Sequence, residues 1–393
     1  MYLTDTTNRF SNSILTGTAT YSATPANTAN FQLSGSYGAV NMEDGRVFCI
    51  PSFDLTNYAN LSLTYNPYLI LNPGTSNMEN RWSGEYLNST GWYNATQAGG
   101  ESPHAFDGAV LMDNGWVFMV PHNSAKYAIY GPSINDMVSY STIPTLWTVS
   151  GYNNIGNFKG GVLLPDNRVL CIPHNSNQFL IYNRYDPNVV AGAGFTTLNS
   201  LVTGVSGSFS NGVLMPNGLV LTVPYNSTSA IVFNYANNSQ TVLSEVFTGN
   251  KAYIGGVLMQ DGRVFLVPHN ATAAKIYNPV TSTFAAASGV YPGNQAFSGG
   301  VLMPNGNIFL VPYKYNRAVI YNPTTNAITT LNENFTGYQS NGGLLTKTGH
   351  VFLVPGVYKD AKYFLYSPYN NYIASGDLNL DINFITSPYY NKA

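Results

Sequence analysis

The chain has 393 residues, of which 44% are hydrophobic and 9% are charged, and its formal net charge is -2. This balance excludes a charge-rich disordered chain and a strongly basic nucleic-acid-binding protein. Tyr, Phe and Gly are abundant, with 30, 20 and 37 residues, and Asn, Ser and Thr are frequent. That composition favours short strands joined by tight turns, so we expect an all-β fold.

Residues 1–30 are polar and precede the repeated part of the chain. They contain no basic stretch followed by an apolar core, and no apolar run in the chain approaches the roughly 18 residues of a membrane helix. We therefore expect a soluble protein without a signal peptide or transmembrane segment. The segment has two interpretations: an arm that docks onto a larger assembly, or a strand that completes the fold.

Residues 31–382 contain seven copies of one pattern, of which GGVLMQDGRVFLVPHN from Gly255 is representative. Each copy has a proline at the same place, and successive prolines are 43 to 70 residues apart. The prolines are Pro51, Pro121, Pro173, Pro224, Pro268, Pro312 and Pro355. Most of these spacings are typical of propeller blades. The sequence therefore predicts a seven-bladed β-propeller, with an open β-solenoid as the alternative.

Four antiparallel strands are expected in each unit. The first begins with small residues such as Gly299 and Gly300, which suits the strand nearest the axis. A two-residue turn such as Asp261-Gly262 follows, in which we expect both residues to adopt positive φ. The second strand, such as Val264–Val267, is apolar throughout, as expected in the middle of a blade. A Tyr-Asn-Pro turn, as at Tyr277, then separates a third strand from a short outer strand.

Two segments interrupt or follow the repeats. The longest interval between prolines is the first, which predicts an inserted loop over residues 74–102. This loop contains Trp82, Trp92 and Tyr93, and aromatic residues on long loops are frequent at binding hot spots. A loop that packs on its own blade is the alternative. Residues 383–393 form a C-terminal tail.

The order of inner strand, Asp-Gly, apolar strand and Tyr-Asn-Pro resembles the kelch-type repeat of galactose-oxidase-like propellers. The resemblance covers about residues 35–376 and implies the fold, because family membership alone carries no chemistry. Kelch repeats usually have a Gly-Gly pair where this chain has Pro-His-Asn or Pro-Tyr-Asn. The units are also similar to repeats in structural or receptor-binding proteins of bacterial viruses, which implies a place on a virion surface.

The end of the second strand and the start of the first lie on one face of an antiparallel blade, so that face should collect one polar segment from each of several blades. Imidazole, phenol and carboxamide groups suit a glycan. The predicted ligand-binding residues are His122, Asn123, His174, Asn175, Tyr225, Asn226, His269, Asn270, Tyr313 and Lys314, with Trp82, Trp92 and Tyr93 from the insertion. The alternative is structural: proline ends the strand, Asn closes an Asx turn, and His or Tyr packs on the neighbouring blade.

No metal, cofactor or catalytic activity is expected. Histidines at equivalent positions of a ring do not converge on one ion. Cys49 and Cys171 occupy equivalent positions of non-adjacent units, which predicts core residues without a disulfide. The carboxylates fall mainly in hairpin turns, whereas glycoside hydrolysis needs a pair about 5 to 9.5 Å apart. The sequence has no sialidase Asp box, Gly-x-Ser-x-Gly elbow, Walker loop or His-Glu-x-x-His motif.

The first hypothesis for function is a non-enzymatic propeller on a virion surface, which decorates the capsid or acts in receptor binding. Its partners would be other structural proteins of the particle and cell-surface glycans, and neither nucleic acid nor membrane insertion is expected. A free lectin-like, carbohydrate-binding propeller is the second hypothesis. A carbohydrate-active enzyme on the same scaffold is the third.

Overall fold

The computed structural model describes the β-strands of the chain and many of the turns and loops between them. The described ranges are 38–42, 47–50, 67–72, 77–82, 106–123, 126–131, 136–142, 156–184, 194–332, 334–335, 339–345, 349, 351–355, 362–368 and 372–377. The expected N-terminal segment 1–30, the C-terminal tail 383–393 and residues 83–102 of the expected insertion lie outside them. Within these ranges, no helix is long and apolar enough to cross a membrane.

The described residues form seven four-stranded antiparallel sheets, each made of strands consecutive in sequence. The first strands are β1 (Ala39–Asn41), β5 (Phe106–Leu111), β9 (Phe158–Leu163), β13 (Phe209–Leu214), β17 (Tyr253–Leu258), β21 (Phe297–Leu302) and β25 (Ser340–Leu345). The second strands are β2 (Val47–Cys49), β6 (Val117–Pro121), β10 (Val169–Pro173), β14 (Leu219–Pro224), β18 (Val264–Pro268), β22 (Ile308–Pro312) and β26 (Val351–Pro355). The third strands are β3 (Pro67–Asn72), β7 (Lys126–Gly131), β11 (Gln178–Tyr182), β15 (Ile231–Asn234), β19 (Lys275–Asn278), β23 (Val319–Asn322) and β27 (Lys362–Ser367). The fourth strands are β4 (Asn77–Trp82), β8 (Asp136–Thr142), β12 (Phe195–Asn199), β16 (Ser239–Val242), β20 (Thr283–Ala286), β24 (Ala327–Thr330) and β28 (Tyr372–Asp377).

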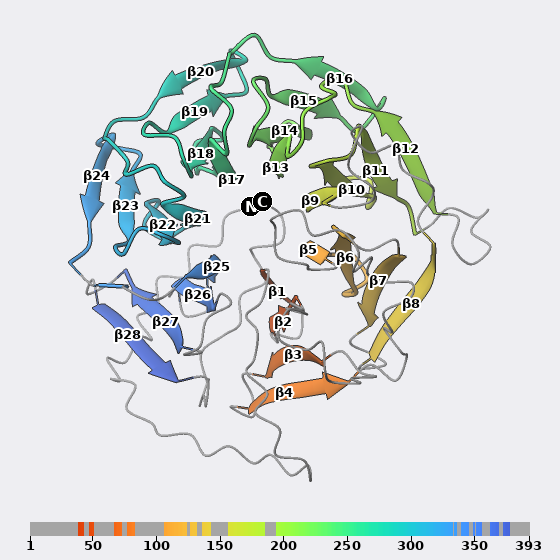
Figure 1. Cartoon of the computed structure of the whole chain (residues 1–393), viewed down its shortest axis with the longest axis horizontal. Helices are drawn as coiled ribbons and strands as arrows, with labels where there is room; N and C mark the ends of the chain where they lie inside the picture. The colour runs from red at the N-terminus through yellow and green to blue at the C-terminus, as the bar shows by residue number, and fades with distance from the viewer. Residues whose placement is uncertain are drawn as a thin grey trace.

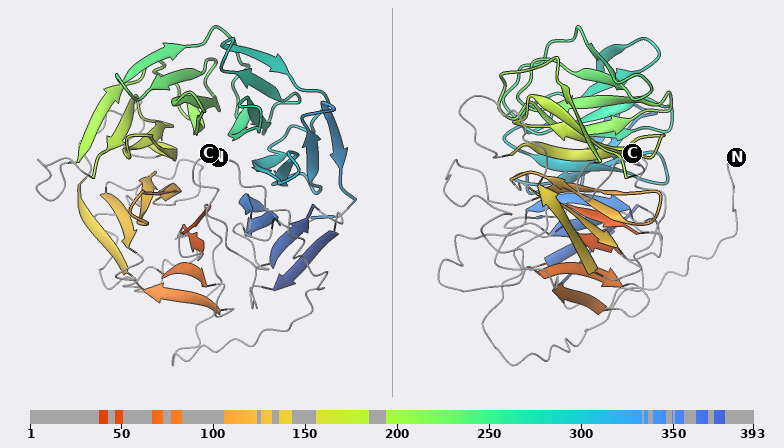
Figure 2. Two further views of the ribbon diagram at one scale, coloured as in Figure 1. Left: turned by 180° about the vertical axis from the view of Figure 1, so that it is seen from behind. Right: turned by 90° about the vertical axis from the view of Figure 1, so that its right-hand side faces the viewer.

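The sheets are arranged around a common axis, with the first strands nearest the centre and the fourth strands at the rim (Figure 1). Each first strand contacts the first strand of the next sheet, and β25 contacts β1, so the ring is closed. Figure 2 shows the same disc from behind and from the side. The prediction of an all-β propeller built from four-stranded antiparallel sheets is confirmed, and the closed ring contradicts the open solenoid.

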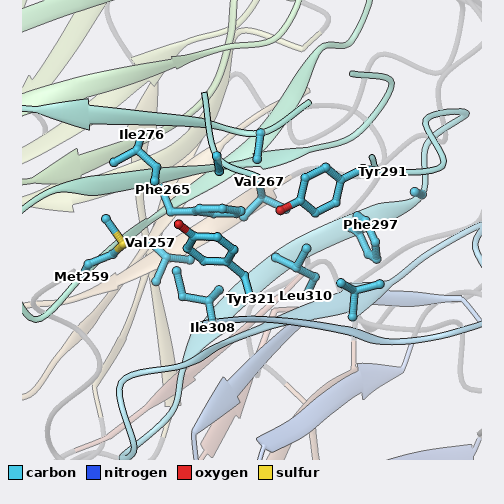
Figure 3. Packing of buried hydrophobic residues seen from close by; sticks show 14 residues of the cluster. Val257, Met259, Phe265, Val267, Ile276, Tyr291, Phe297, Ile308, Leu310 and Tyr321 are labelled. Carbon is cyan, nitrogen blue, oxygen red and sulfur yellow. The ribbon is translucent and has the colours of Figure 1, made fainter. Parts of the chain in front are cut away.

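Apolar clusters lie between neighbouring sheets and form the core. Between the sheets of β17 and β21, Phe265 packs against Tyr321, with ring centroids 4.7 Å apart and an interplanar angle of 29° (Figure 3). Ile308 and Leu310 of β22 are fully buried in the same cluster. Burying one such side chain stabilises a fold by about 1.5–3 kcal/mol. The second strands are therefore continuously apolar because both of their faces are covered.

Small residues in the first strands allow the close packing that the sequence predicted near the axis. A Cβ atom at Gly300 would lie 2.8 Å from Val257 Cγ2 and 3.0 Å from Val267 Cγ2. A Cβ atom at Gly108 would lie 2.9 Å from the Cα atom of Gly160 in the next blade. The glycines are therefore required by the close approach of the neighbouring blade, through valine side chains at Gly300 and through the backbone at Gly108.

The hairpins between first and second strands differ from the expected two-residue turns. In the hairpin after β5, Gly115 N–H donates to Met112 O at 3.0 Å, and Met112 N–H donates to Trp116 O at 2.8 Å. Gly115 has a φ of 78°, whereas Asn114 is not among the residues with positive φ. This is the three-residue loop in which one residue adopts the left-handed conformation. The expectation that both turn residues have positive φ is therefore wrong.

The first residue of each expected pair has a different role in the turn. Asn114 Oδ1 accepts the N–H of Trp116 at 3.0 Å, and Asp261 Oδ1 accepts the N–H of Arg263 at 3.0 Å. An Asx side chain that bonds the backbone two residues later needs no positive φ of its own. Asn and Asp are therefore selected as acceptors, and the left-handed residue is the next one, which is Gly115 or Gly262 in these hairpins and Asn167 in the hairpin after β9.

The first sheet departs from the expected placing of its outer strands. β3 begins at Pro67, the proline of the Tyr-Asn-Pro sequence of this unit, where the pattern predicts the end of a third strand, and it ends at Asn72. β4, Asn77–Trp82, lies inside the range predicted as an inserted loop. Proline at the first position of a strand leaves the ladder intact, which explains why Pro67 can begin β3.

Candidate functional site

The second strands end and the first strands begin on one side of the disc, which we call the loop face. Phe106 pairs with Pro121, and Phe297 pairs with Pro312, so the residues after each proline lie beside the start of a first strand. The loop face is defined by residues 121–123, 173–175, 224–226, 268–270 and 312–314. Ten of the thirteen predicted ligand-binding residues therefore lie on this face.

Five of these residues form a continuous row of rings across neighbouring blades, which we call the aromatic arc. The ring centroids of His122 and His174 are 5.7 Å apart, and those of His174 and Tyr225 are 5.5 Å apart. Tyr225 and His269 follow at 5.9 Å, and His269 and Tyr313 at 6.0 Å. The repeat therefore converts one sequence position into a band of aromatic side chains on one face.

The three histidines of the arc are buried and bound to the next blade. His122 and His174 are 1% exposed, and His269 is 5% exposed. Their Nδ1 atoms lie 2.6, 2.7 and 2.6 Å from the backbone oxygens of residues 158, 209 and 297, respectively. Because a carbonyl oxygen only accepts, each Nδ1 donates, and the lone pair of the neutral ring is on Nε2.

His269 is uncharged at neutral pH. Burial of the ring lowers the pKa of His269 to about 4, and the hydrogen bond to the Phe297 carbonyl opposes this shift. The positive charges of Lys159, Lys251 and Lys314 lower the pKa further. His269, the fourth ring of the arc, is therefore neutral and subject to the positive charge of three lysines.

The asparagines of the loop face hold the linkers that lead to the next blades. Each Oδ1 atom accepts a backbone N–H from such a linker. The pairs are Asn123 with Gly156 at 2.6 Å, Asn175 with Gly207 at 2.6 Å, Asn226 with Lys251 at 2.8 Å and Asn270 with Gln295 at 2.8 Å. The structural alternative expected an Asx turn, but the amide crosses to the neighbouring blade and joins the two units.

Burial divides the predicted residues into two groups. The histidines, Tyr225, Asn123 and Asn175 are less than 9% exposed and pack between blades. Asn226, Asn270 and Tyr313 are half-buried, and Lys314 is exposed. Trp82 is the last residue of β4, the outer strand of the first sheet, and pairs with Pro67. Trp92 and Tyr93 lie outside the described residues.

Sequence reasoning missed two lysines beside the arc. The Nζ atoms of Lys159 and Lys251 each lie 6.0 Å from the ring centroid of Tyr225. Lys159 also forms an ion pair with Asp107, with 2.9 Å between Nζ and Oδ2. Comparison of the units could have found them, because the place of Lys159 is taken by serine, Ser298, in a later unit.

Neither metal ligands nor a reactive thiol stand out in the described part of the chain. No group of three or more His, Cys, Asp or Glu side chains there could hold a metal ion. Cys171 is a buried free thiol, and burial raises its pKa well above the ordinary value. A thiol of this kind is a core residue and a poor nucleophile.

Comparison with known proteins shows the fold. No protein-family model matches the chain, and no curated protein matches it. Virginiamycin B lyase from Staphylococcus aureus is similar in structure, with a TM-score of 0.61 and 10% identity over 84% of this chain and 94% of that chain. A streptogramin B lyase has a TM-score of 0.63 and 12% identity over 84% and 93%. The extracellular domain of a one-component system from B. thetaiotaomicron has a TM-score of 0.59 and 13% identity over 88% and 44%.

These likenesses correct one prediction. The absence of catalytic motifs led to the expectation that the chain is not an enzyme, and that expectation is wrong, because similar propellers include lyases. At 10–13% identity the likeness shows the propeller fold alone and assigns no activity to this chain. Catalysis is therefore one of the functions that the loop face has to be tested for.

Proposed function

We propose that the protein is a seven-bladed, kelch-like propeller that binds a carbohydrate on its loop face. The seven four-stranded sheets and the contact of β25 with β1 support the blade number. The observation that carries the binding proposal is the aromatic arc, which runs over five consecutive blades and brings rings, amides and ammonium groups to one face.

The half-buried members of the face supply contacts that a sugar requires. Tyr313 offers a ring against which the C–H face of a sugar packs. Asn226 and Asn270 each use one acceptor and one donor position in the contacts between blades. An amide has two acceptor and two donor positions, so both side chains retain hydrogen-bonding capacity for hydroxyl groups.

A glycan array tests this proposal, with Tyr313→Ala as the informative variant. Tyr235 is also half-buried but packs beside Gly218 in a hairpin at the other end of the strands, so Tyr235→Ala is the matched control. We expect wild type and the control to bind the same glycans and Tyr313→Ala to bind them at least tenfold more weakly. Absence of any bound glycan, or equal binding by Tyr313→Ala, contradicts the proposal.

Alanine variants of the predicted ligand-binding histidines are unsuitable as tests of glycan binding. His122 and His269 are buried and donate to backbone carbonyls of the next blade. Replacing either with alanine leaves a buried acceptor without its donor, which destabilises the fold whether or not a ligand binds there.

We place this module on the surface of a virus particle, where it binds structural proteins of the particle and cell-surface glycans. Support comes from the charge-poor, Asn- and Tyr-rich composition and from the near-identical units. Immunogold labelling of purified particles tests the placement. Labelled particles support it, whereas protein found only in the soluble fraction favours a free lectin-like propeller.

A second candidate function is catalysis on the same face. Support comes from the structural likeness to lyases, one of which was studied as a catalytically inactive histidine-to-alanine variant with quinupristin. In this chain the neutral His269 has its lone pair on Nε2, as a proton acceptor requires. Chromatography of quinupristin after incubation tests this function: conversion that is lost in His269→Asn supports it, and unchanged antibiotic contradicts it.

A further inference from the structure

Three lysines stand where the repeat has other residues, and we call them the lysine cluster: Lys159, Lys251 and Lys314. Lys159 takes the place of Ser210 and Ser298 in later units. Lys314 takes the place of the asparagine that joins blades elsewhere, such as Asn270. The residue at the place of Lys159 varies further, with Asp107 and Ile254 in other units, so these lysines are features of single units and not of the repeat.

Lys251 occupies a position at which several units share a left-handed backbone conformation. Its equivalents in two earlier units are Gly156 and Gly207, and all three residues have positive φ, at 56°, 65° and 67°. Glycine adopts this left-handed conformation without strain, whereas a side chain with a Cβ atom does so at a cost. Gln295 occupies the same position in the next unit with a φ of 58°, so the fold tolerates a side chain there, and Lys251 differs from these equivalents in bringing an ammonium group to the loop face.

The cluster converges on the middle of the aromatic arc. Lys159 and Lys251 come from different blades, and their Nζ atoms lie at the same distance, 6.0 Å, from the Tyr225 ring centroid. Lys314 follows Tyr313, whose ring is 6.0 Å from that of His269. The charges of all three lysines also lower the pKa of His269.

The local charge is positive although the whole chain is weakly acidic. Three of the 16 Lys and Arg residues meet here in a chain with a formal net charge of -2. Asp107 pairs with Lys159. Among the described residues, Lys251 and Lys314 form no ion pair. Three ammonium groups against one carboxylate leave a positive surplus beside neutral aromatic rings and amides.

We propose that the ligand of the loop face is an acidic saccharide, whose carboxylate or sulfate group binds to Lys251 and Lys314. This inference rests on the proposed carbohydrate-binding function and names its substrate class. Ammonium groups attract the anionic substituent, while Tyr313 and the amides contact the uncharged part of the sugar. A long polyanion such as nucleic acid is less suitable, because the chain as a whole has 18 acidic residues against 16 basic ones.

The test uses immobilised oligosaccharides in matched pairs. Each uronate-bearing member has a methyl-esterified partner, each sulfated member has a desulfated partner, and a single-stranded oligonucleotide is included. The tightest oligosaccharide is then titrated calorimetrically against wild type, Lys251→Met and Lys314→Met. Arg263→Met is the matched control, because Arg263 precedes β18 at the end of that strand remote from His269 and its loss changes the net charge equally.

We expect the acidic member of a pair to bind and its neutral partner to bind at least tenfold more weakly. Each lysine variant should weaken binding by about fivefold at 0.05 M salt and by less at 0.5 M, because salt screens charges that are exposed. The Arg263→Met protein should bind as wild type does. Circular dichroism melting curves establish that all variants are folded.

The outcomes separate this inference from the proposed function. Equal binding of acidic and neutral partners, or unchanged affinity of both lysine variants, overturns the acidic ligand and leaves carbohydrate binding in place. Binding of the oligonucleotide with none of the saccharides overturns both. Folded protein that binds no member of the panel also overturns both. Acid-selective binding that is lost in the lysine variants and retained in Arg263→Met supports the inference.

Discussion

At the scale of single residues, the buried His269 of the aromatic arc makes the stability of the fold depend on pH. The pKa of His269 is about 4 in the folded protein, against an ordinary value of 6.5 in an unfolded chain. Between these values the unfolded chain binds a proton that the folded chain does not, so the free energy of unfolding falls as the pH falls from 6.5 to 4. We expect this site to remove on the order of 3 kcal/mol over that window, measured by urea unfolding at each pH.

The variant His269→Asn isolates this contribution. Asparagine retains an N–H that can donate to the Phe297 carbonyl, but it does not titrate. The difference in unfolding free energy between wild type and variant should therefore shrink as the pH falls from 7 to 4. A constant difference over this range would mean that His269 titrates at its ordinary pKa and is accessible to water.

Two adjacent glycines of β21 are expected to differ sharply in what they tolerate. Alanine at Gly300 would bring its Cβ atom to 2.8 Å from Val257 and 3.0 Å from Val267, and valine side chains have little freedom to move away. Overpacking of this kind costs about 1–3 kcal/mol, so Gly300→Ala should lower the midpoint of chemical unfolding.

Gly299 is the matched control for this substitution. A Cβ atom there meets only Gly342 Cα, at 3.8 Å, and Gly299 is not among the glycines with positive φ. Gly299→Ala should therefore leave stability within about 0.5 kcal/mol of wild type, which is usual away from special sites. Equal loss in both variants would show that strand conformation, and not contact with the neighbouring blade, determines the need for glycine.

At the scale of strands and turns, the positions of the first and second strands followed from the sequence, whereas the outer strands of the first sheet and the geometry of the turns did not. Alternation of small residues, Asp-Gly or Asn-Gly and apolar runs identified the first two strands of each unit. The same dipeptides fit a two-residue and a three-residue loop, because both place glycine in the left-handed region. The hydrogen bond from Gly115 to Met112 decided between them, and that bond depends on strand twist that the residue types do not specify.

The side chain of Asn270 forms hydrogen bonds with two loop segments, and their contribution to stability can be measured. Asn270→Ala removes the acceptor of the Gln295 N–H and the donor to Asn250 O, both at 2.8 Å. One net hydrogen bond contributes about 0.5–1.5 kcal/mol, and a partly buried N–H left unbonded adds to the loss. We expect Asn270→Ala to lower the unfolding free energy by about 1–2 kcal/mol in a urea titration.

Lys314 is at the equivalent position of the next unit and provides the comparison. Its side chain is exposed, so Lys314→Ala should change the unfolding free energy by less than about 0.5 kcal/mol. Similar destabilisation by Lys314→Ala and Asn270→Ala would show that the position matters through the backbone and not through the amide.

At the scale of the whole molecule, repetition predicted the ring but not which side chains meet on it. The spacing of prolines predicts radial units, and the loop face follows from strand order. The meeting of Lys159 and Lys251 at Tyr225 depends on side-chain directions from three blades, which no pattern within one unit records. The division of the predicted site into buried and accessible residues likewise depends on how tightly neighbouring blades pack.

A closed ring should unfold as one unit, because every blade covers apolar surface of two neighbours. Opening the sheet of β21 uncovers Val267 on one side and Leu353 on the other, so the loss is not local. The Leu170 amide in β10 lies three blades away from Gly300 along the chain. We therefore expect Gly300→Ala to lower the hydrogen-exchange protection of this amide by the same free energy that urea unfolding reports. Gly299→Ala should leave that amide unchanged. If Gly300→Ala lowered protection only in β21, β22, β23 and β24, the blades would behave as the nearly independent units of an open repeat array, and closure would contribute little to stability.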